Sequence, residues 1–294
     1  MTDYLPPLLH AERVIGGRRF DFSRRVAVMA IVNRTPDSFH DRGRTFALDR
    51  ATEAVRAAAE AGADWIDIGG VPFAPGPEVS AAEELDRVLP VVEAAQGLAV
   101  VSVDTFRPEV ARAVVKAGAG VVNDTSGLRD PEMADVVAGT DASLVITHSL
   151  AAPRTAYPGP TYGDVTTEVA DFLRQRVQLA LDRGVRPEQI IIDPGHDLNK
   201  NTLHTLEVTR RLHEVADIGH PLLAAVSNKD FIGETLDLPQ RERLSGTLAA
   251  VVFCVLRGAR IVRVHDVRPA VEAVRMTEAM LGLRPPAYTR HNLP

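Results

Sequence analysis

The chain has 294 residues, of which 45% are hydrophobic and 5% aromatic, and its formal net charge is −6. This acidic balance argues against a nucleic-acid-binding surface, which normally requires a clustered basic face. No apolar run reaches the ~18 residues of a membrane span, and the N-terminal segment lacks the sections of a secretory signal. We therefore expect a cytoplasmic protein that acts on small molecules, with no nucleic-acid or membrane partner.

Eight short apolar runs recur along the chain, and each stops at a polar residue. Stretches with helical apolar spacing lie between them, for example 48–61, 110–117 and 172–181, so strand and helix alternate. Eight such pairs are typical of a TIM (β/α)8 barrel, an α/β fold. The runs are 28–33, 65–67, 100–104, 121–124, 144–148, 190–193, 222–227 and 261–265.

We expect a single domain, with the barrel over residues 26–283. Residues 1–25 form an N-terminal extension in which 13–22 reads as a short hairpin around Gly16 and Gly17, covering the bottom of the barrel. The proline-rich segment 284–294 is expected to be a loose tail. Cys254, the only cysteine, lies in an apolar helical stretch, so a buried, inert thiol is expected.

The polar residue at the end of each run is a candidate site residue. The active face of such a barrel is formed by the C-terminal ends of its strands, so these side chains should surround one pocket. They are Asn33, Asp67, Asp104, Asn123, His148, Asp193, Ser227 and His265.

The segment 33–41 after the first strand is rich in polar and ionisable side chains. One interpretation is a helix-capping loop, because Pro and Asp initiate turns. The segment is, however, longer than the ~2 to 6 residues of a usual βα connection, which favours a lid over the pocket.

Four strand-end groups offer a mixed set of hydrogen-bonding partners. Asp104 and Asp193 are acceptors, Asn123 both donates and accepts, and Lys229 after the seventh strand is a cation. Together they predict a polar slot for the edge of a fused heterocycle. A carboxylate pair for glycoside cleavage is the competing interpretation, but it needs a sugar cleft lined by aromatic side chains, which are scarce here.

Arg263 and His265 lie two residues apart on the eighth strand and so point the same way. A guanidinium beside an imidazole suits a phosphate group, although Arg263 could instead pair with a structural carboxylate such as Asp266. His196 and His204 would form a metal site only with a further ligand that the sequence does not supply.

Several blocks of this chain, in order, resemble those of the dihydropteroate synthase family. Residues 29–39 (MAIVNRTPDSF) resemble the family's first loop, N-V-T-P-D-S-F, and 63–70 (ADWIDIGG) its second strand. The match extends from about residue 27 to 268, and several blocks in the right order are more specific than any single motif. The further blocks are 102–105 (SVDT), 122–124 (VND), 192–195 (IDPG), 227–233 (SNKDFIG) and 263–266 (RVHD).

The resemblance implies a transferase of folate biosynthesis that joins a dihydropterin methyl group to p-aminobenzoate and releases diphosphate. It places the pterin against Asp104, Asn123, Asp193 and Lys229. It also implies a homodimer, for which the apolar helix 246–256 is a candidate face, although that helix could simply pack on its own barrel. Other implied roles are diphosphate binding by Asn33, Arg263 and His265, Mg²⁺ held near Asn33, and catalysis by Asp37, Lys229, Arg263 and His265.

The chain departs from the family pattern in the second loop. Family members carry E-S-T-R-P-G there, whereas residues 71–76 read VPFAPG, so that Ala74 stands at the arginine position. Arg34 in the first loop replaces a valine, and our hypothesis is that Arg34 supplies the missing guanidinium.

The amine pocket implied by the resemblance contains Phe39, Pro75, Leu198 and Asp230. Asp230 stands where the family has a serine near the p-aminobenzoate carboxylate, and Leu198 replaces an aromatic residue. Two like charges ~4 Å apart repel by several kcal/mol at an effective dielectric of about 20, so weak or absent use of p-aminobenzoate is expected.

An intact pterin slot beside an altered amine site resembles the second dihydropteroate synthase-like paralogue of actinobacteria. Three interpretations remain: a transferase that is slow or uses another amine, an inactive pterin-binding paralogue with no folate role, and a pterin-dependent methyl-transfer domain. The last would have no need of the Arg263 and His265 pair.

Overall fold

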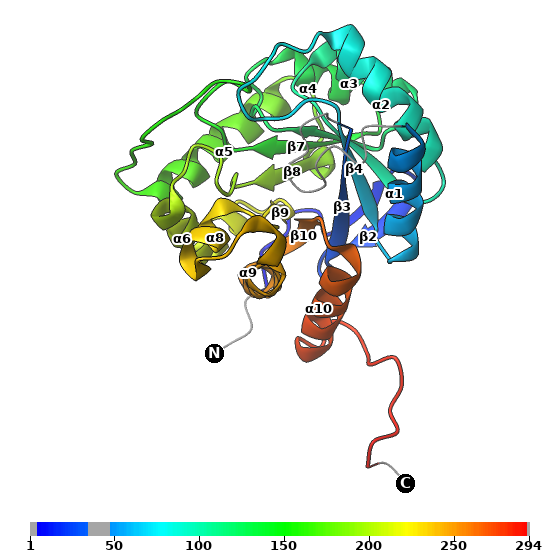
Figure 1. Cartoon of the computed structure of the whole chain (residues 1–294), viewed down its shortest axis with the longest axis vertical. Coiled ribbons are helices and arrows are strands. Elements are labelled where there is room, and N and C mark those ends of the chain that lie inside the picture. Colours follow the sequence, from blue (N-terminus) through cyan, green and yellow to red (C-terminus); the bar gives the residue numbers. More distant parts are fainter. Residues whose placement is uncertain (1–4, 35–47, 293–294) are drawn as a thin grey trace.

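The computed structural model describes residues 5–34 and 48–292. Eight parallel strands form a closed barrel in chain order, with the last pairing back onto the first (Figure 1). This arrangement confirms the predicted barrel. The strands are β3 (Ala27–Asn33), β4 (Trp65–Gly69), β5 (Val100–Asp104), β6 (Val121–Asp124), β7 (Ser143–Thr147), β8 (Ile190–Asp193), β9 (Leu222–Ala224) and β10 (Ala259–Val264).

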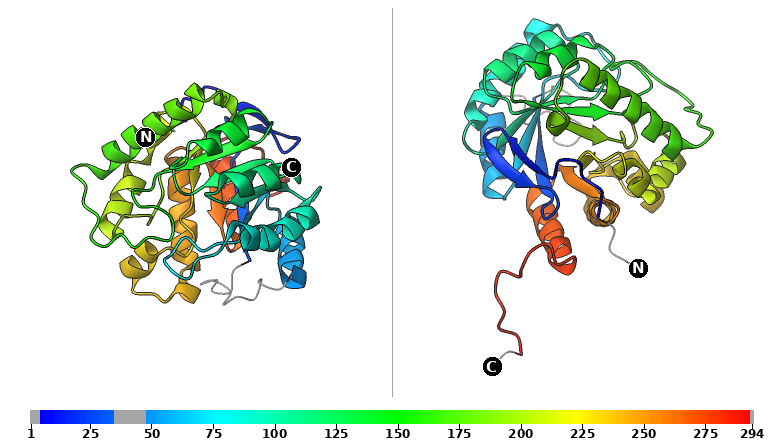
Figure 2. Two further views of the ribbon diagram at one scale, coloured as in Figure 1. Left: turned by 90° about the horizontal axis from the view of Figure 1, so that it is seen from above. Right: turned by 180° about the vertical axis from the view of Figure 1, so that it is seen from behind.

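Helices surround the barrel, as the two views of Figure 2 show. The three helical stretches predicted from apolar spacing are confirmed, although α5 begins earlier than expected because Asp164 accepts a hydrogen bond from the backbone N of Thr167 at 3.0 Å. None of the helices in the described part is long and apolar enough to cross a membrane. The helices are α1 (Leu48–Glu60), α2 (Ala81–Ala95), α3 (Pro108–Lys116), α4 (Glu132–Ala138), α5 (Val165–Asp182), α6 (Thr202–Arg210), α7 (Leu212–Ala216), α8 (Asp230–Leu236), α9 (Leu244–Leu256) and α10 (Val267–Met280).

Side chains of each strand alternate between two apolar cores. One core lies between strands and helices, and the other fills the barrel interior. Because strand side chains have a period of two, the interior positions fix which residues further along each strand also face the barrel axis. The interior positions include Met29, Trp65, Val100, Val121, Val145, Ile191, Leu223 and Ile261.

An N-terminal hairpin closes the bottom of the barrel, as predicted. It consists of β1 (Glu12–Ile15) and β2 (Arg18–Asp21), joined by Gly16 and Gly17 with φ of 54° and 74°. Positive φ at both central residues is the geometry that glycine permits in tight hairpins. Phe20 and Phe22 belong to the interior core, and the ring of Phe20 lies 5.6 Å from that of Trp65.

Candidate active site

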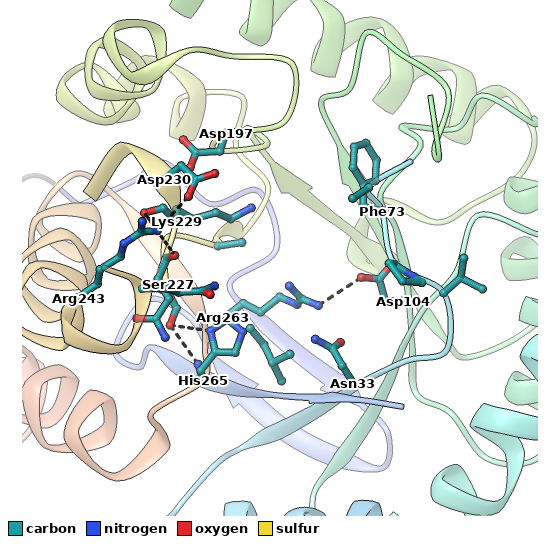
Figure 3. A pocket seen from close by; sticks show the side chains of 17 residues that line it. Asn33, Phe73, Asp104, Asp197, Ser227, Lys229, Asp230, Arg243, Arg263 and His265 are labelled. Atoms are coloured by element: carbon teal, nitrogen blue, oxygen red, sulfur yellow. Dashed lines mark hydrogen bonds and ion pairs between the residues drawn. The ribbon is translucent and has the colours of Figure 1, made fainter. Parts of the chain in front are cut away.

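A cavity of about 580 Å³ opens at the C-terminal ends of the strands. Its inner part is polar, and its outer part is formed by the segment after β4 and the start of α8 (Figure 3). The structure thus gathers many of the predicted residues into one site. The polar residues that line the inner part are Asn33, Asp104, Ser227, Lys229, Arg263 and His265.

Arg263 is the centre of a buried network beneath this cavity. Its Nη2 donates to Asp104 Oδ2 at 3.2 Å (Figure 3). Its Nε donates to Asp67 Oδ2 at 2.6 Å. Asp67 also accepts from Ser102 Oγ at 2.6 Å and from Asn123 Nδ2 at 3.0 Å. The alternative expectation, that Arg263 pairs with a structural carboxylate, is therefore met, but the partners are Asp67 and Asp104 and not Asp266.

Burial raises the pKa of two carboxylates of the predicted slot, Asp104 and Asp193. It raises the pKa of Asp104, against the opposing effect of Arg263. It also raises the pKa of Asp193 to about 6, although the backbone N of Gly195 donates to Asp193 Oδ1 at 2.7 Å. Burial lowers the pKa of Lys229, which lines the same cavity. The slot therefore contains acceptors whose protonation is sensitive to a bound ligand.

The carboxamide of Asn123 is oriented by the same network. Its nitrogen donates to Asp67, whereas its oxygen is buried without a hydrogen-bond partner among the described residues. A buried acceptor without a donor is costly, so this oxygen favours a ligand that brings an N–H group.

Four of the eight predicted strand-end residues line the cavity: Asn33, Asp104, Ser227 and His265. Asp67, Asn123 and Asp193 are at inward-facing positions of their strands but outside this lining. The prediction that His148 faces the cavity is wrong. Val145 faces the barrel interior, and because strand side chains alternate with a period of two, Thr147 faces inward and His148 outward. His148 Nδ1 lies 2.8 Å from Lys200 Nζ instead. The sequence analysis missed Thr147, whose hydroxyl is buried with no partner among the described residues and whose strand position pairs with Asp193. Strand parity was the signal that could have identified it.

Asn33 and His265 lie on neighbouring strands at the edge of the cavity. A Cβ at Gly69 would lie 2.9 Å from Asn33 Oδ1, so the glycine leaves room for this carboxamide beside β4. Ser227 Oγ accepts from the backbone N of His265 at 3.1 Å and lies 3.0 Å from its Nδ1. The imidazole is thereby oriented with Nε2 as its remaining polar atom.

Arg154, from the segment after β7, holds the second loop in place. Its Nη1 donates to the carbonyl oxygens of Pro72 at 2.9 Å and Ala74 at 2.5 Å, and its Nη2 donates to that of Pro77 at 2.6 Å. Ala74 lines the cavity, whereas Pro75, predicted for the amine pocket, is exposed and lies outside its lining. Phe73 is the lining aromatic residue of this loop.

The hypothesis that Arg34 replaces the missing guanidinium is wrong. Arg34 Nη1 donates to the carbonyl oxygens of Asp86 at 2.9 Å and Arg87 at 2.7 Å, both in α2, and Arg34 does not line the cavity. Pro90 explains this position: lacking an N–H, it leaves the carbonyl oxygen of Asp86, four residues earlier, without its helical donor. The side chain of Arg34 therefore satisfies backbone acceptors of α2.

The start of α8 carries the altered amine side. Asp230 lines the cavity, and its Oδ1 accepts from Arg243 Nη1 at 3.0 Å. Asp197, which the sequence analysis missed, also lines the cavity, and its Oδ2 accepts from the backbone N of Phe231 at 3.2 Å. Leu198, beside it, lies outside the lining. Two carboxylates, Asp197 and Asp230, therefore lie at this end of the cavity.

Two further predicted residues, Asp37 and Phe39, lie outside the described residues. Their roles stay predictions. In the described part of the chain, no group of three His, Cys, Asp or Glu residues could hold a metal ion. His196 stacks on Phe231, and His204 contacts Tyr162, so the two histidines do not form a metal pair. Cys254 is fully buried, and burial raises its pKa to about 12, which confirms an inert thiol.

Comparison with known proteins decides the family. The model of a family described as pterin binding enzyme matches residues 29–265. The chain belongs to this family. It is 43% identical over 277 residues to "Inactive dihydropteroate synthase 2" of Mycobacterium tuberculosis, covering 92% of this chain and 87% of that protein.

Other family members are nearly as similar. The "Dihydropteroate synthase" of Synechocystis is 40% identical over 285 residues, covering 95% of this chain and 97% of that protein. A structure of Xanthomonas albilineans dihydropteroate synthase with 4-aminobenzoic acid has a TM-score of 0.84 and 38% identity, covering 92% and 98% of the two chains. Overall identity therefore does not separate an active protein from an inactive one, and the distinction rests on individual site residues.

Proposed function

We propose that this protein is a dihydropteroate synthase-type transferase that acts on a dihydropterin methyl diphosphate. The observation that carries the proposal is the buried network of Arg263 with Asp67, Asp104 and Asn123. Four groups from four strands are held at fixed positions in one polar slot. An acceptor, a mixed donor and acceptor, and a nearby cation match the edge of a pterin ring.

The pterin ring would lie in the inner part of the cavity. Asp104 and Lys229, which line the cavity, would accept from and donate to the ring. Asp193 and the free oxygen of Asn123, at inward-facing positions of β8 and β6, would accept its remaining N–H groups. Because these groups are already positioned by the barrel, little conformational freedom is lost on binding. A methyl-transfer domain would share this slot but would have no use for the cationic groups beside it.

The diphosphate would lie against Arg263, His265 and Asn33 at the edge of the cavity. In the reaction, the lone pair of the amine forms a C–N bond to the pterin methylene as its C–O bond breaks. The bonding electron pair leaves with the diphosphate, and the amine nitrogen releases a proton to water. Arg263 and His265 would stabilise the negative charge that accumulates on the leaving group.

Mg²⁺ would fit at this end of the site as an ion coordinated by both the protein and the substrate diphosphate. The oxygen ligand available is the carboxamide of Asn33, which lines the cavity, and the described residues offer no larger ligand cluster. A cation that binds mainly through substrate phosphates and water needs few protein ligands. When bound, it would neutralise charge on the diphosphate.

A pterin-binding protein with weak or no synthase activity is the alternative function, with no role in making folate. The observation that favours it is the pair of carboxylates, Asp197 and Asp230, on the amine side of the cavity. The alternative keeps every pterin contact and differs in turnover.

The test is a titration followed by an assay. We expect calorimetry to show that dihydropterin methyl diphosphate with Mg²⁺ binds, and that Asp104→Asn and Asp193→Asn weaken binding at least ~10-fold. No binding by the wild-type protein would refute both the transferase and the pterin-binding alternative. Release of diphosphate upon adding p-aminobenzoate would refute the inactive alternative.

We also propose that the protein forms a homodimer through α9 and α10. Phe253 and Leu256 of α9 and Met276 and Met280 of α10 are exposed, and the two helices are neighbours. Adjacent exposed apolar side chains indicate an interface. Thr247, Val251, Cys254 and Val255 pack α9 on its own barrel. Sedimentation of wild type and Phe253→Glu tests this, since a monomeric wild type would contradict it.

A further inference from the structure

We propose that the second reactant of this site carries no carboxylate and that a positively charged end is preferred, with Asp197 as the specificity-determining residue. The inference rests on the proposed transferase function and names its amine class. It starts from the outer end of the cavity, where Asp197 and Asp230 lie together on one side and Phe73 on the other (Figure 3).

Asp197 is fixed in place by both of its carboxylate oxygens. Oδ1 accepts from Thr205 Oγ1 at 3.0 Å, and Oδ2 accepts from the backbone N of Phe231 at 3.2 Å. The residue itself has a φ of 61°, a conformation that Asp and Asn tolerate better than other side chains. A carboxylate of the protein thus takes the backbone donor in the first turn of α8, and a substrate carboxylate would have to displace it.

The nearby guanidinium of Arg243 does not offset this. Its Nη1 donates to the carbonyl oxygens of Asn228 at 3.0 Å and Lys229 at 3.1 Å and to Asp230 Oδ1 at 3.0 Å, and its Nε donates to the carbonyl oxygen of Leu238 at 3.1 Å. These contacts of Nη1 and Nε connect α8 to the start of α9, and Arg243 also lines the cavity. A substrate carboxylate that approached this guanidinium would compete with its ion pair to Asp230.

Lys229 is the other cation at this end. Its electrostatic neighbours are Asp197, Asp193 and Asp230, all of which favour its charged form, and Arg263, which opposes it. A substrate carboxylate would compete with these carboxylates for one ammonium group. A cation would instead gain from Asp197 and from the ring of Phe73 across the cavity.

The inference changes which arylamine reacts and leaves the bond-forming step unchanged. The amine nitrogen still forms the C–N bond to the pterin methylene as the C–O bond breaks, diphosphate leaves with the electron pair, and the surplus amine proton goes to water. The group at the far end of the arylamine takes no part in bond formation, so its charge affects affinity and positioning alone.

Three arylamines of nearly equal size separate the charge states: 4-aminobenzoate, 4-aminobenzamide and 4-aminobenzamidine. Each is titrated calorimetrically into the full-length protein saturated with dihydropterin methanol, Mg²⁺ and diphosphate, which together cannot react forward. We expect 4-aminobenzoate to bind at least ~10-fold more weakly than the amide, and the amidine to bind more tightly than the amide.

Asp197→Asn is the decisive variant, because asparagine keeps the size, the positive φ and an acceptor for Phe231. We expect it to strengthen 4-aminobenzoate binding at least ~5-fold while the affinity for the neutral amide stays within twofold. Asp230→Asn, at an exposed side chain, repeats the test if Asp197→Asn fails to fold.

Failure of this inference is distinguishable from failure of the proposed function. If wild type binds the pterin but prefers 4-aminobenzoate to the amide, or binds the amidine more weakly than the amide, or binds none of the three, the inference is overturned and pterin binding stands. If the pterin itself does not bind, the proposed function fails first.

Discussion

The guanidinium of Arg34 donates to the carbonyl oxygen of Asp86, the acceptor that Pro90 leaves unfilled inside α2. Arg34 directly follows the strand-end residue Asn33, which lines the cavity, yet its side chain contacts α2. A position near a site in sequence is therefore no guarantee of a role in it.

We predict that Arg34→Ala lowers the free energy of unfolding by about 0.5–1 kcal/mol, because the exposed carbonyl oxygen of Asp86 and the partly buried one of Arg87 lose a donor. Diphosphate affinity should stay within twofold of wild type. Urea unfolding and calorimetry provide the two measurements. In a Pro90→Ala background the backbone N–H is restored, so Arg34→Ala should cost less there. Equal costs in both backgrounds would contradict the link between Arg34 and Pro90.

Pterin binding should weaken in acid through Asp193. Its pKa is raised to about 6 by burial, so it loses its charge, and one acceptor position, as the pH falls below that value. The dissociation constant should rise up to ~10-fold per pH unit below pH 6 and be nearly constant above pH 8. Asp193→Asn should bind weakly at every pH. An unchanged affinity of wild type between pH 5 and 8 would rule out this role.

In the unliganded protein, the raised pKa of Asp193 makes folding stability depend on pH in the opposite direction to pterin affinity. Because the folded state holds this proton more tightly than the unfolded state does, the contribution of Asp193 to stability decreases as the pH rises from about 4 to 6.

Asp67→Asn should damage both stability and diphosphate binding. Asp67 accepts from Arg263, Ser102 and Asn123, and replacing it leaves a buried guanidinium with the single carboxylate of Asp104. We expect a loss of about 3 kcal/mol in unfolding free energy and a drop of ~10-fold or more in diphosphate affinity. Asp266→Asn is the matched control and should have little effect on either quantity.

Lys200 should make stability depend on pH in the alkaline range. Burial lowers its pKa to about 7, so between pH 7 and 9 the folded state has released a proton that the unfolded state retains. The unfolding free energy should rise by up to ~1.4 kcal/mol per pH unit from this group. Urea unfolding of Lys200→Met should show a smaller slope, whereas Lys116→Met, at an exposed position of α3, should retain that of wild type.

The barrel was predictable because its evidence is repeated eight times along the chain. The direction of an individual side chain was harder to predict than the barrel, as His148 shows. Its run ends one residue beyond the interior position, and a shift of one residue in a strand reverses the face on which a side chain lies. Counting from the interior residue Val145 would have selected Thr147.

Contacts between distant segments were beyond the sequence. Arg34 meets α2, Asp197 meets the backbone of α8, and Arg154 meets the second loop, and none of these pairings follows from local spacing. Asp104, Asn123 and Asp193 were predictable because each lies at the end of its own strand, whereas Lys229 directly precedes α8. The amine-side residues lie on loops, whose paths are set by tertiary contacts.

The aromatic side chains of the hairpin fill the foot of the barrel, so among the described residues the cavity opens at the C-terminal ends of the strands. In the proposed reaction the pterin slot is the deeper of the two substrate positions, so the pterin would have to bind before the amine. An amine that arrives before the pterin would obstruct its path, and excess amine should therefore slow turnover rather than saturate it.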